Sequence, residues 1–252
     1  MIPYERKKTI LTKLNEQDIV TLDELQTILS GVSVSTIRRD LKDLEKVGHV
    51  TLLPGGAAKL FSRSTDIPIT KRTSLNRNEK KEIALLAVEE IKLGETIYVD
   101  SGSTGEELLL ELAKKKVTLI TSVTNFKIPF QDVEAQIYSL GGFVNFTNNS
   151  LKGELAVQNI EYFNFDRAFI GANGVDAKFG YTTPDLSEAI KKRKVIEKSQ
   201  EVYFICDSSK FHKVYTSTIA PLSDSVLITN KNDEVIKGNL KQLIFSSIDT
   251  YQ

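Results

Sequence analysis

The sequence predicts an α/β protein in two parts, in which a small domain of helices and a short hairpin precedes a larger α/β domain. Three observations predict it. Residues 1–60 carry three amphipathic helix patterns, with apolar side chains three and four positions apart. Residues 61–77 are polar and irregular, which is typical of a linker. Over residues 78–252, apolar runs of strand length alternate with helical patterns, which is typical of a parallel sheet covered by helices.

Two helices are predicted at the start of the chain. The first spans residues 4–14, and the second opens at Thr21, which has Glu24 three positions later, the spacing of a capping box. The apolar residues expected on the inner sides of these helices are Ile10, Leu11, Leu14, Leu22, Leu25, Ile28 and Leu29. Gly31 then makes a tight turn into a third helix, which gives helix-turn-helix spacing.

The third helix has one apolar face and one basic face. Ser33 is a suitable N-cap and Gly48 a suitable stop. The apolar face carries Ile37, Leu41 and Leu44, and the opposite face carries Ser35, Arg38, Arg39 and Lys42. Most basic faces are merely solvated. A DNA recognition helix has the same pattern, because its apolar side seats it while Arg and Ser or Thr reach phosphates and base edges.

The residues after this helix favour the DNA-binding interpretation. Two short apolar runs, residues 50–53 and 57–60, flank Pro54-Gly55-Gly56 and predict a small hairpin, or wing. With this wing, the motif VSxxTIRRDLxxLE resembles the N-terminal winged helix-turn-helix of the DeoR family of bacterial transcriptional regulators. Pro54 departs from the family, which usually has His there. The DNA-binding residues that we expect are Ser35, Thr36, Arg38, Arg39 and Lys42.

Charge limits how this domain could hold DNA. The chain has 33 basic and 33 acidic residues, and residues 1–59 have nine basic and eight acidic side chains, a net charge of +1. There is little bulk attraction to nucleic acid. We therefore expect a monomer to bind DNA poorly, and a homo-oligomer (dimer or tetramer) to bind double-stranded operator DNA.

Composition excludes several other classes of function. Cys206 is the only cysteine, and the sequence has neither an apolar run of membrane-spanning length nor a signal peptide, so we expect a cytoplasmic protein without membrane contact. His49 and His212 are the only histidines and lie in different predicted domains. No metal site, cofactor or catalytic triad is therefore predicted.

The larger domain is predicted to begin with a helix over residues 79–91, capped by Asn78 and followed by Gly94. A second helix is predicted over residues 106–114. The predicted strands are residues 96–99, 117–120, 135–140, 168–170, 202–206 and 226–228. Residues 232–252 carry no motif that indicates a role.

Four polar loops follow predicted strands, at residues 100–105, 121–125, 171–176 and 207–210. In a parallel sheet such loops meet at the carboxyl ends of the strands, where ligands bind. Any one of them would more often be a simple turn. The first, however, is rich in small residues and opens a helix, whose N–H groups suit a phosphate.

The order of these loops also resembles the C-terminal sensor of the DeoR family. The shared motifs are D-x-G-[ST]-T, TN, Gly141-Gly142, Gly153, GxxG and D-x-SK. The resemblance implies a fold similar to the sugar-phosphate isomerase and CoA-transferase group, with a phosphorylated sugar as effector. It implies effector contacts from Asp100, Ser101, Gly102, Ser103, Thr104, Gly105, Thr124, Asn125, Asp176, Asp207 and Lys210. The basic run at residues 191–194 is interpreted mainly as a solvated helix face.

Two functions remain open at this point. The first is a transcriptional regulator, in most cases of this family a repressor, of a sugar-metabolism operon, released from its operator by a phosphorylated sugar. The alternative is a sugar-phosphate isomerase-like enzyme with an added DNA-binding domain, whose base would be Glu188. The isomerases' glycine-rich segment is replaced here by residues 180–184, and Glu188 is better explained as a helix N-terminal residue favoured by the dipole.

Overall fold

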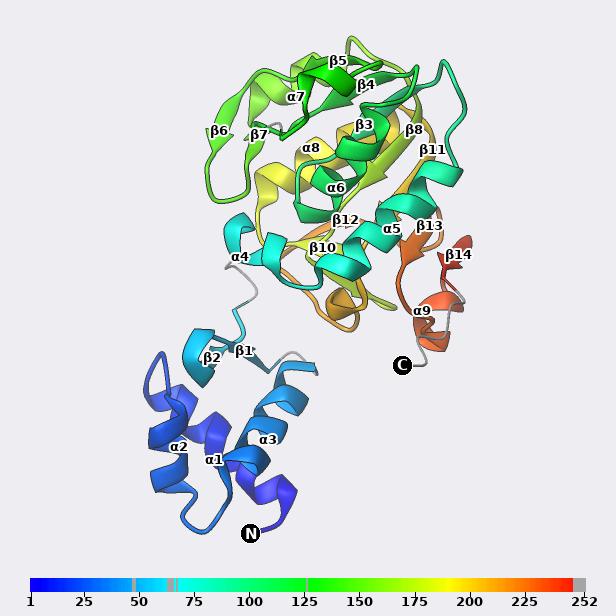
Figure 1. Ribbon diagram of the computed structural model, residues 1–252. Helices are drawn as coiled ribbons and strands as arrows, with labels where there is room; N and C mark the ends of the chain where they lie inside the picture. Colours follow the sequence, from blue (N-terminus) through cyan, green and yellow to red (C-terminus); the bar gives the residue numbers. More distant parts are fainter. Residues whose placement is uncertain (47–48, 63–65, 67, 126, 247–252) are drawn as a thin grey trace. The chain divides into compact units, whose positions relative to one another are not determined.

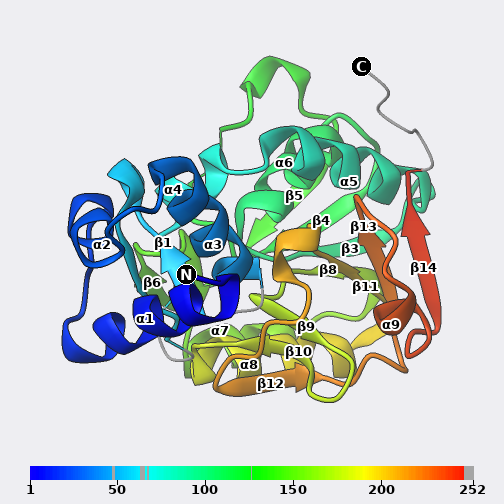
Figure 2. The same ribbon diagram turned by 90° about the horizontal axis from the view of Figure 1, so that it is seen from below.

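The structure is a computed structural model, which describes residues 1–46, 49–62, 66, 68–125 and 127–246. The chain forms two compact units, Met1–Arg63 and Ser64–Gln252 (Figures 1 and 2). No helix in the described ranges combines the length and the apolar character needed to cross a bilayer.

The N-terminal unit contains the three predicted helices and the predicted wing. Its elements are α1 (Pro3–Glu16), α2 (Leu22–Ile28), α3 (Val34–Lys46), β1 (Val50–Leu52), the 3-10 turn η1 (Pro54–Gly56) and β2 (Ala58–Leu60). The capping box at Thr21 and Glu24 is confirmed, since each side chain bonds the other residue's backbone N–H. The prediction for Ile28 is wrong because α2 ends there. Leu29 leaves helical geometry and enters the core, while Ile28 stays exposed.

Helix α3 is held to α1 by packing and by an ion pair. Ile37, Leu41 and Leu44 are buried as predicted. Asp40, also buried, accepts two hydrogen bonds from the Arg6 guanidinium, from Nε at 2.6 Å and from Nη2 at 3.1 Å. The burial of the apolar face, together with this pair, turns the basic face away from the core.

The wing is an antiparallel hairpin in which Val50 lies opposite Leu60 and Leu52 opposite Ala58. Gly55 and Gly56 have φ angles of +83° and +84°, a left-handed conformation that residues with a Cβ rarely adopt. Val20 and Ala58 exchange backbone hydrogen bonds of 2.9 and 2.8 Å, which attach the wing to the chain between α1 and α2.

The larger unit is built on a seven-stranded sheet, in the order β14-β13-β11-β8-β3-β4-β5, and every described pair is parallel as predicted. The strands are β3 (Thr96–Val99), β4 (Thr118–Thr121), β5 (Gln136–Ser139), β8 (Phe165–Ile170), β11 (Ser199–Ile205), β13 (Val226–Thr229) and β14 (Gln242–Phe245). Strand β14 lies within residues 232–252, a segment in which the sequence analysis found no motif.

Helices cover both faces of this sheet (Figure 1). On one face α5 (Arg77–Glu89) and α6 (Ser103–Leu112) pack with Ile97 and Val99. On the other face, α7 (Glu154–Ile160) and α8 (Leu186–Glu197) pack with Tyr98. Successive side chains of β3 thus point to opposite faces of the sheet, as in any strand. The remaining elements are α4 (Ile69–Ser74), η2 (Phe130–Asp132), β6 (Phe143–Asn145), β7 (Ser150–Lys152), β9 (Gly174–Asp176), β10 (Gly180–Thr183), η3 (Ser208–Lys210), β12 (Ser217–Ala220) and α9 (Glu234–Lys237).

Two predictions near the start of this unit are wrong. The segment expected to be a linker with order only at residues 67–69 contains helix α4, because Ile69 is buried and the helix packs on α6. Asn78 does not cap α5. The helix begins two residues earlier, after Asn76, which has a φ of +51° and whose side chain bonds Asp207 instead.

Candidate functional site

The N-terminal unit presents a polar and basic surface on α3. Ser35, Arg38, Arg39 and Lys42 are exposed, and Thr36 is half-buried. The Ser33 hydroxyl lies 2.9 Å from that of Ser35 and 2.8 Å from that of Thr36. Among the described residues, no carboxylate forms an ion pair with Arg38, Arg39 or Lys42. Their charges are therefore available to an external polyanion.

A cavity in the larger unit lies where loops leave the carboxyl ends of β3, β8 and β11. It is lined by Arg72, Ser101, Gly102, Ser103, Thr104, Gly105, Gly171, Ala172, Asn173, Lys192, Ile205, Cys206, Asp207 and Lys210. Helix α6 begins here without a side-chain cap, so its first N–H groups point to this region. Gly105 permits this approach, because a Cβ there would lie 2.1 Å from the carbonyl oxygen of Asp100.

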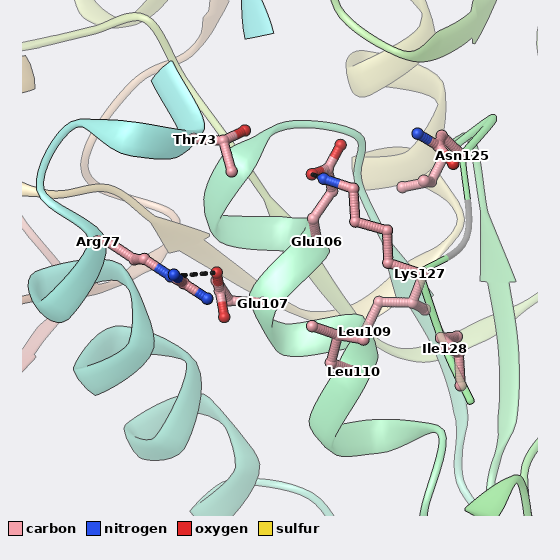
Figure 3. Close-up of a pocket in the computed structure, with 10 residues that line it drawn as sticks. Thr73, Arg77, Glu106, Glu107, Leu109, Leu110, Asn125, Lys127 and Ile128 are labelled. Carbon is pink, nitrogen blue, oxygen red and sulfur yellow. Dashed lines mark ion pairs between the residues drawn. The ribbon is translucent and has the colours of Figure 1, made fainter. Parts of the chain in front are cut away.

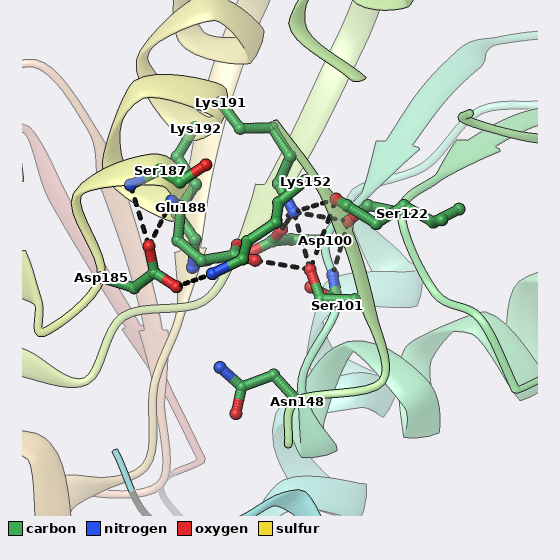
Figure 4. Close-up of polar contacts among 12 residues, drawn as sticks. Asp100, Ser101, Ser122, Asn148, Lys152, Asp185, Ser187, Glu188, Lys191 and Lys192 are labelled. Atoms are coloured by element: carbon green, nitrogen blue, oxygen red, sulfur yellow. Dashed lines mark hydrogen bonds and ion pairs between the residues drawn. The ribbon is translucent and has the colours of Figure 1, made fainter. Parts of the chain in front are cut away.

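Four buried charges lie beneath this cavity (Figure 4). The Asp100 carboxylate accepts from Lys192 Nζ at 2.8 Å and from the Gly171 N–H at 3.2 Å. Lys191 Nζ pairs with Glu188 at 2.9 Å and lies 3.9 Å from Asp100. We call Asp100, Glu188, Lys191 and Lys192 the charge cluster. Lys191 is fully buried and Lys192 nearly so. The prediction that residues 191–194 form mainly a solvated helix face is therefore wrong for these two lysines.

Hydroxyl and backbone groups complete the charge cluster. Lys191 Nζ also donates to Ser122 Oγ at 3.1 Å, Ser150 Oγ at 3.0 Å and the Leu151 carbonyl at 3.0 Å. Glu188 lies in the first turn of α8 as predicted and accepts from Ser150 Oγ at 2.6 Å. Burial would raise the pKa of Glu188, but Lys191 and Lys192 oppose it and lower that pKa to about 2. Glu188 is therefore a permanent anion near neutral pH.

Asp207 and Lys210 both reach the cavity, as expected from the fourth loop. Asp207 is buried and accepts from the Ser209 N–H at 3.0 Å and from Asn76 Nδ2 at 3.0 Å. Burial raises the pKa of Asp207, whereas Lys210 and the Ser209 hydrogen bonds lower it, and the net direction is downward. Asp176 does not line this cavity. Its carboxylate accepts from the N–H groups of Lys178 and Phe179 in the turn between β9 and β10.

Thr124 and Asn125 also lie apart from it. The Thr124 N–H donates to the Asn149 carbonyl at 3.0 Å. Asn125 lines a second cavity (Figure 3), together with Thr73, Arg77, Glu106, Glu107, Leu109, Leu110, Val123, Lys127 and Ile128. There Arg77 faces Glu107 and Lys127 faces Glu106, each pair at 3.9 Å. Each cation of this second cavity thus has a carboxylate partner. The first cavity is lined by Arg72, Lys192 and Lys210; of these, Lys192 pairs with Asp100 and Arg72 with Asp66, at 2.8 and 3.6 Å.

Sequence reasoning missed seven residues that line the first cavity, among them Arg72, Asn173 and Lys192, which carry side-chain nitrogen donors. The GxxG motif contains Asn173, and a basic helix face contains Lys192, so both had a local signal. Arg72 had none, because it lies in the segment interpreted as a linker.

Comparison with known proteins identifies the family. Residues 6–63 match the model of the DeoR-like helix-turn-helix domain, and residues 75–231 match that of the DeoR C terminal sensor domain. The chain belongs to the DeoR family of transcriptional regulators.

Curated relatives in this family match over most of their length. The uncharacterized HTH-type transcriptional regulator FruR of Bacillus subtilis (strain 168) is 32% identical over 96% of both chains. The transcriptional repressor AccR of Agrobacterium fabrum is 32% identical over 92% of this chain and 91% of its own. A ribose 5-phosphate isomerase A from Methanocaldococcus jannaschii aligns with 54% of this chain and 55% of its own, at 20% identity and a TM-score of 0.40, too low to bear on function.

These matches confirm the predicted family and the predicted two-part fold, a helix-turn-helix domain followed by an α/β domain with a parallel sheet. The chain is a DNA-binding transcriptional regulator with a C-terminal sensor domain. The relatives named above are regulators rather than enzymes.

The charge cluster predicts a large effect of one lysine on stability. Lys191→Met should lower the free energy of unfolding by about 3–5 kcal/mol, because it leaves Glu188 buried without its main counter-charge. Urea denaturation followed by circular dichroism measures this. Lys194→Met on the same helix, whose partners Glu161 and Glu197 are exposed, should leave the midpoint nearly unchanged. Equal midpoints for the two variants would contradict the assignment.

Proposed function

We propose that this regulator is a repressor of a sugar-metabolism operon, and that a phosphorylated sugar bound in the first cavity releases it from its operator. The observation that carries the proposal is the cavity itself. Three cations and the uncapped start of α6 meet at the carboxyl end of the sheet, which suits an anion. The small and polar side chains around them suit hydroxyl groups.

The names of relatives support repression. One is the transcriptional repressor AccR, and another is the putative aga operon transcriptional repressor of Escherichia coli O157:H7, 31% identical over 83% of this chain and 79% of its own. In this proposal the effector binds the DNA-incompetent arrangement more tightly, and DNA weakens effector binding by the same factor.

The proposed DNA contacts are Ser35, Thr36, Arg38, Arg39 and Lys42, which lie together on the outer side of α3. The small net charge of residues 1–59 supports binding by a dimer or tetramer, since two linked units add their contacts to one operator.

The alternative, a sugar-phosphate isomerase, receives little support from Glu188. A general base works best with a pKa near the operating pH, and the pKa of Glu188 is about 2. Its oxygens are also occupied by Ser150 and Lys191. We expect no turnover of ribose 5-phosphate or hexose phosphates in an isomerase assay. Turnover that Glu188→Gln abolishes would establish the enzyme instead.

The direct test of the regulator uses fluorescence anisotropy with labelled DNA from upstream of this protein's own gene and its neighbours. Binding should fall steeply with salt, as phosphate contacts do, and one ester in a panel of hexose and pentose phosphates should release the DNA. Specific binding that no ester changes would refute the proposed effector. If the protein bound none of this DNA specifically at any salt concentration, the proposal that an operator lies there would be refuted.

The recognition helix carries its own prediction. Arg38→Ala should weaken operator binding by about 1–3 kcal/mol if this side chain reads a base edge. Lys13→Ala on α1, whose charge already pairs with Glu16 at 3.2 Å, is the control and should leave the affinity nearly unchanged. Anisotropy measures both. Unchanged operator affinity in Arg38→Ala would remove this residue from the interface.

The loop at residues 100–105 gives a further prediction. Thr104 is buried against the cavity, so Thr104→Met should abolish release by the effector while leaving operator affinity unchanged. Thr218→Met, at an exposed position of β12, is the matched control and should respond as the unsubstituted protein does. If Thr104→Met still responded fully, the effector would bind elsewhere.

A further inference from the structure

This inference rests on the proposed function, in which a phosphorylated sugar binds in the first cavity. The cavity is small for such a ligand. Its volume is about 40 Å³, whereas pockets for small molecules usually measure about 300–1,000 Å³. A sugar phosphate that enters the cavity fully therefore displaces part of its wall. The question is which residues of the wall are held by contacts that the ligand could replace.

One group of polar side chains meets this condition. Asp66 bridges two asparagines, accepting from Asn173 Nδ2 at 2.8 Å through Oδ1 and from Asn148 Nδ2 at 2.8 Å through Oδ2. Arg72 Nη1 lies 3.6 Å from Asp66 Oδ1, and Arg72 Nη2 donates to Asn148 Oδ1 at 2.9 Å. Asn148 and Asn173 are buried, and Asp66 and Arg72 keep only 13% and 14% of their side-chain surface exposed.

The Arg72 guanidinium is incompletely satisfied by these partners. It lines the cavity, and its Nε is buried and makes no hydrogen bond within the part of the chain that the structure describes. Its link to Asp66 is long for a charge-assisted hydrogen bond, which usually measures about 2.7–2.9 Å. Guanidinium groups bind phosphate in a forked arrangement, and a phosphate in the cavity would offer acceptors to the free Nε.

Lys192 and Lys210, the other cations of the cavity, are held differently. Lys192 Nζ is engaged by Asp100 at 2.8 Å and by the Gly171 carbonyl at 2.6 Å. Lys210 follows Asp207, whose carboxylate it faces. Arg72 alone of the three belongs to the stretch of chain that directly follows the DNA-binding unit.

We propose that Arg72 is a phosphate-binding residue of the sensor, and that it exchanges Asp66 for the phosphate group of the effector. The exchange frees the Asp66 carboxylate from its ion pair and opens the cavity wall. Because Asp66 and Arg72 lie at the start of the larger unit, in the stretch of chain that directly follows the DNA-binding unit, the same exchange couples effector binding to the DNA-binding unit.

Inorganic phosphate, titrated calorimetrically into the full-length protein, tests the binding role. Arg72→Gln should weaken phosphate binding about tenfold or more, since it removes a charged donor. Arg72→Lys should restore only part of the affinity, because an ammonium lacks the fork. Arg77→Gln is the matched control, being 76% exposed and paired with Glu107 outside this cavity, and should bind as the unsubstituted protein does.

A second variant tests the exchange and does not depend on the folding of Arg72→Gln. Asp66→Asn keeps the size of the side chain but removes the competing negative charge and one of the two acceptor oxygens, so it should bind phosphate more tightly than the unsubstituted protein. In anisotropy with operator DNA, it should also reduce the factor by which phosphate changes operator affinity. Unchanged or weaker phosphate binding by Asp66→Asn would overturn the exchange.

The outcomes separate this inference from the proposed function. If Lys210→Gln weakens phosphate binding and Arg72→Gln, folded by circular dichroism, does not, Arg72 is not a phosphate ligand and the proposed sensor stands. If the unsubstituted protein binds neither phosphate nor any sugar phosphate at millimolar concentration, both proposals fail together.

Discussion

The sensor domain depends on the pairing of four charges that its own sheet buries. Asp100 ends β3, and Lys191 and Lys192 project from α8 toward it, while Glu188 closes the group from the same helix. An unpaired charge at this depth would cost several kcal/mol, so each member requires the others. The charge cluster consequently fixes where α8 crosses the sheet and how the loop after β3 enters α6.

This arrangement also sets the charge of the cavity above it. Because Asp100 neutralises Lys192 and Glu188 neutralises Lys191, the cluster adds little net charge to the opening. The attraction for an anion must then come from the start of α6, from Lys210 and from Arg72. In the second cavity, Glu106 and Glu107 face the two cations at 3.9 Å each.

The DNA-binding unit uses the same device on a smaller scale. A buried pair between Arg6 and Asp40, together with the burial of the apolar face of α3, leaves the basic side chains on the outside. In both units, then, ionic contacts inside the molecule decide which charges remain for a ligand. This is why a chain with no net charge can present two surfaces suited to anions.

The sequence by itself determined the elements whose reasons are local. The helix-turn-helix, its capping box, the wing with its paired glycines and six strands of the parallel sheet all follow from short-range periodicity and turn chemistry. Loop positions and the family resemblance also grouped residues 101–105 with Asp207 and Lys210, which line one cavity.

Only the tertiary structure decided which polar residues share a site. It separated Thr124, Asn125 and Asp176 from that cavity. Thr124 bonds Asn149, Asp176 bonds the turn that follows it, and Asn125 lines the second cavity. It turned Lys191 and Lys192 inward, because their partners lie on a strand and a loop far away in the sequence. It also brought in Arg72, whose role depends on Asp66 and Asn148 and leaves no periodic signal along the chain.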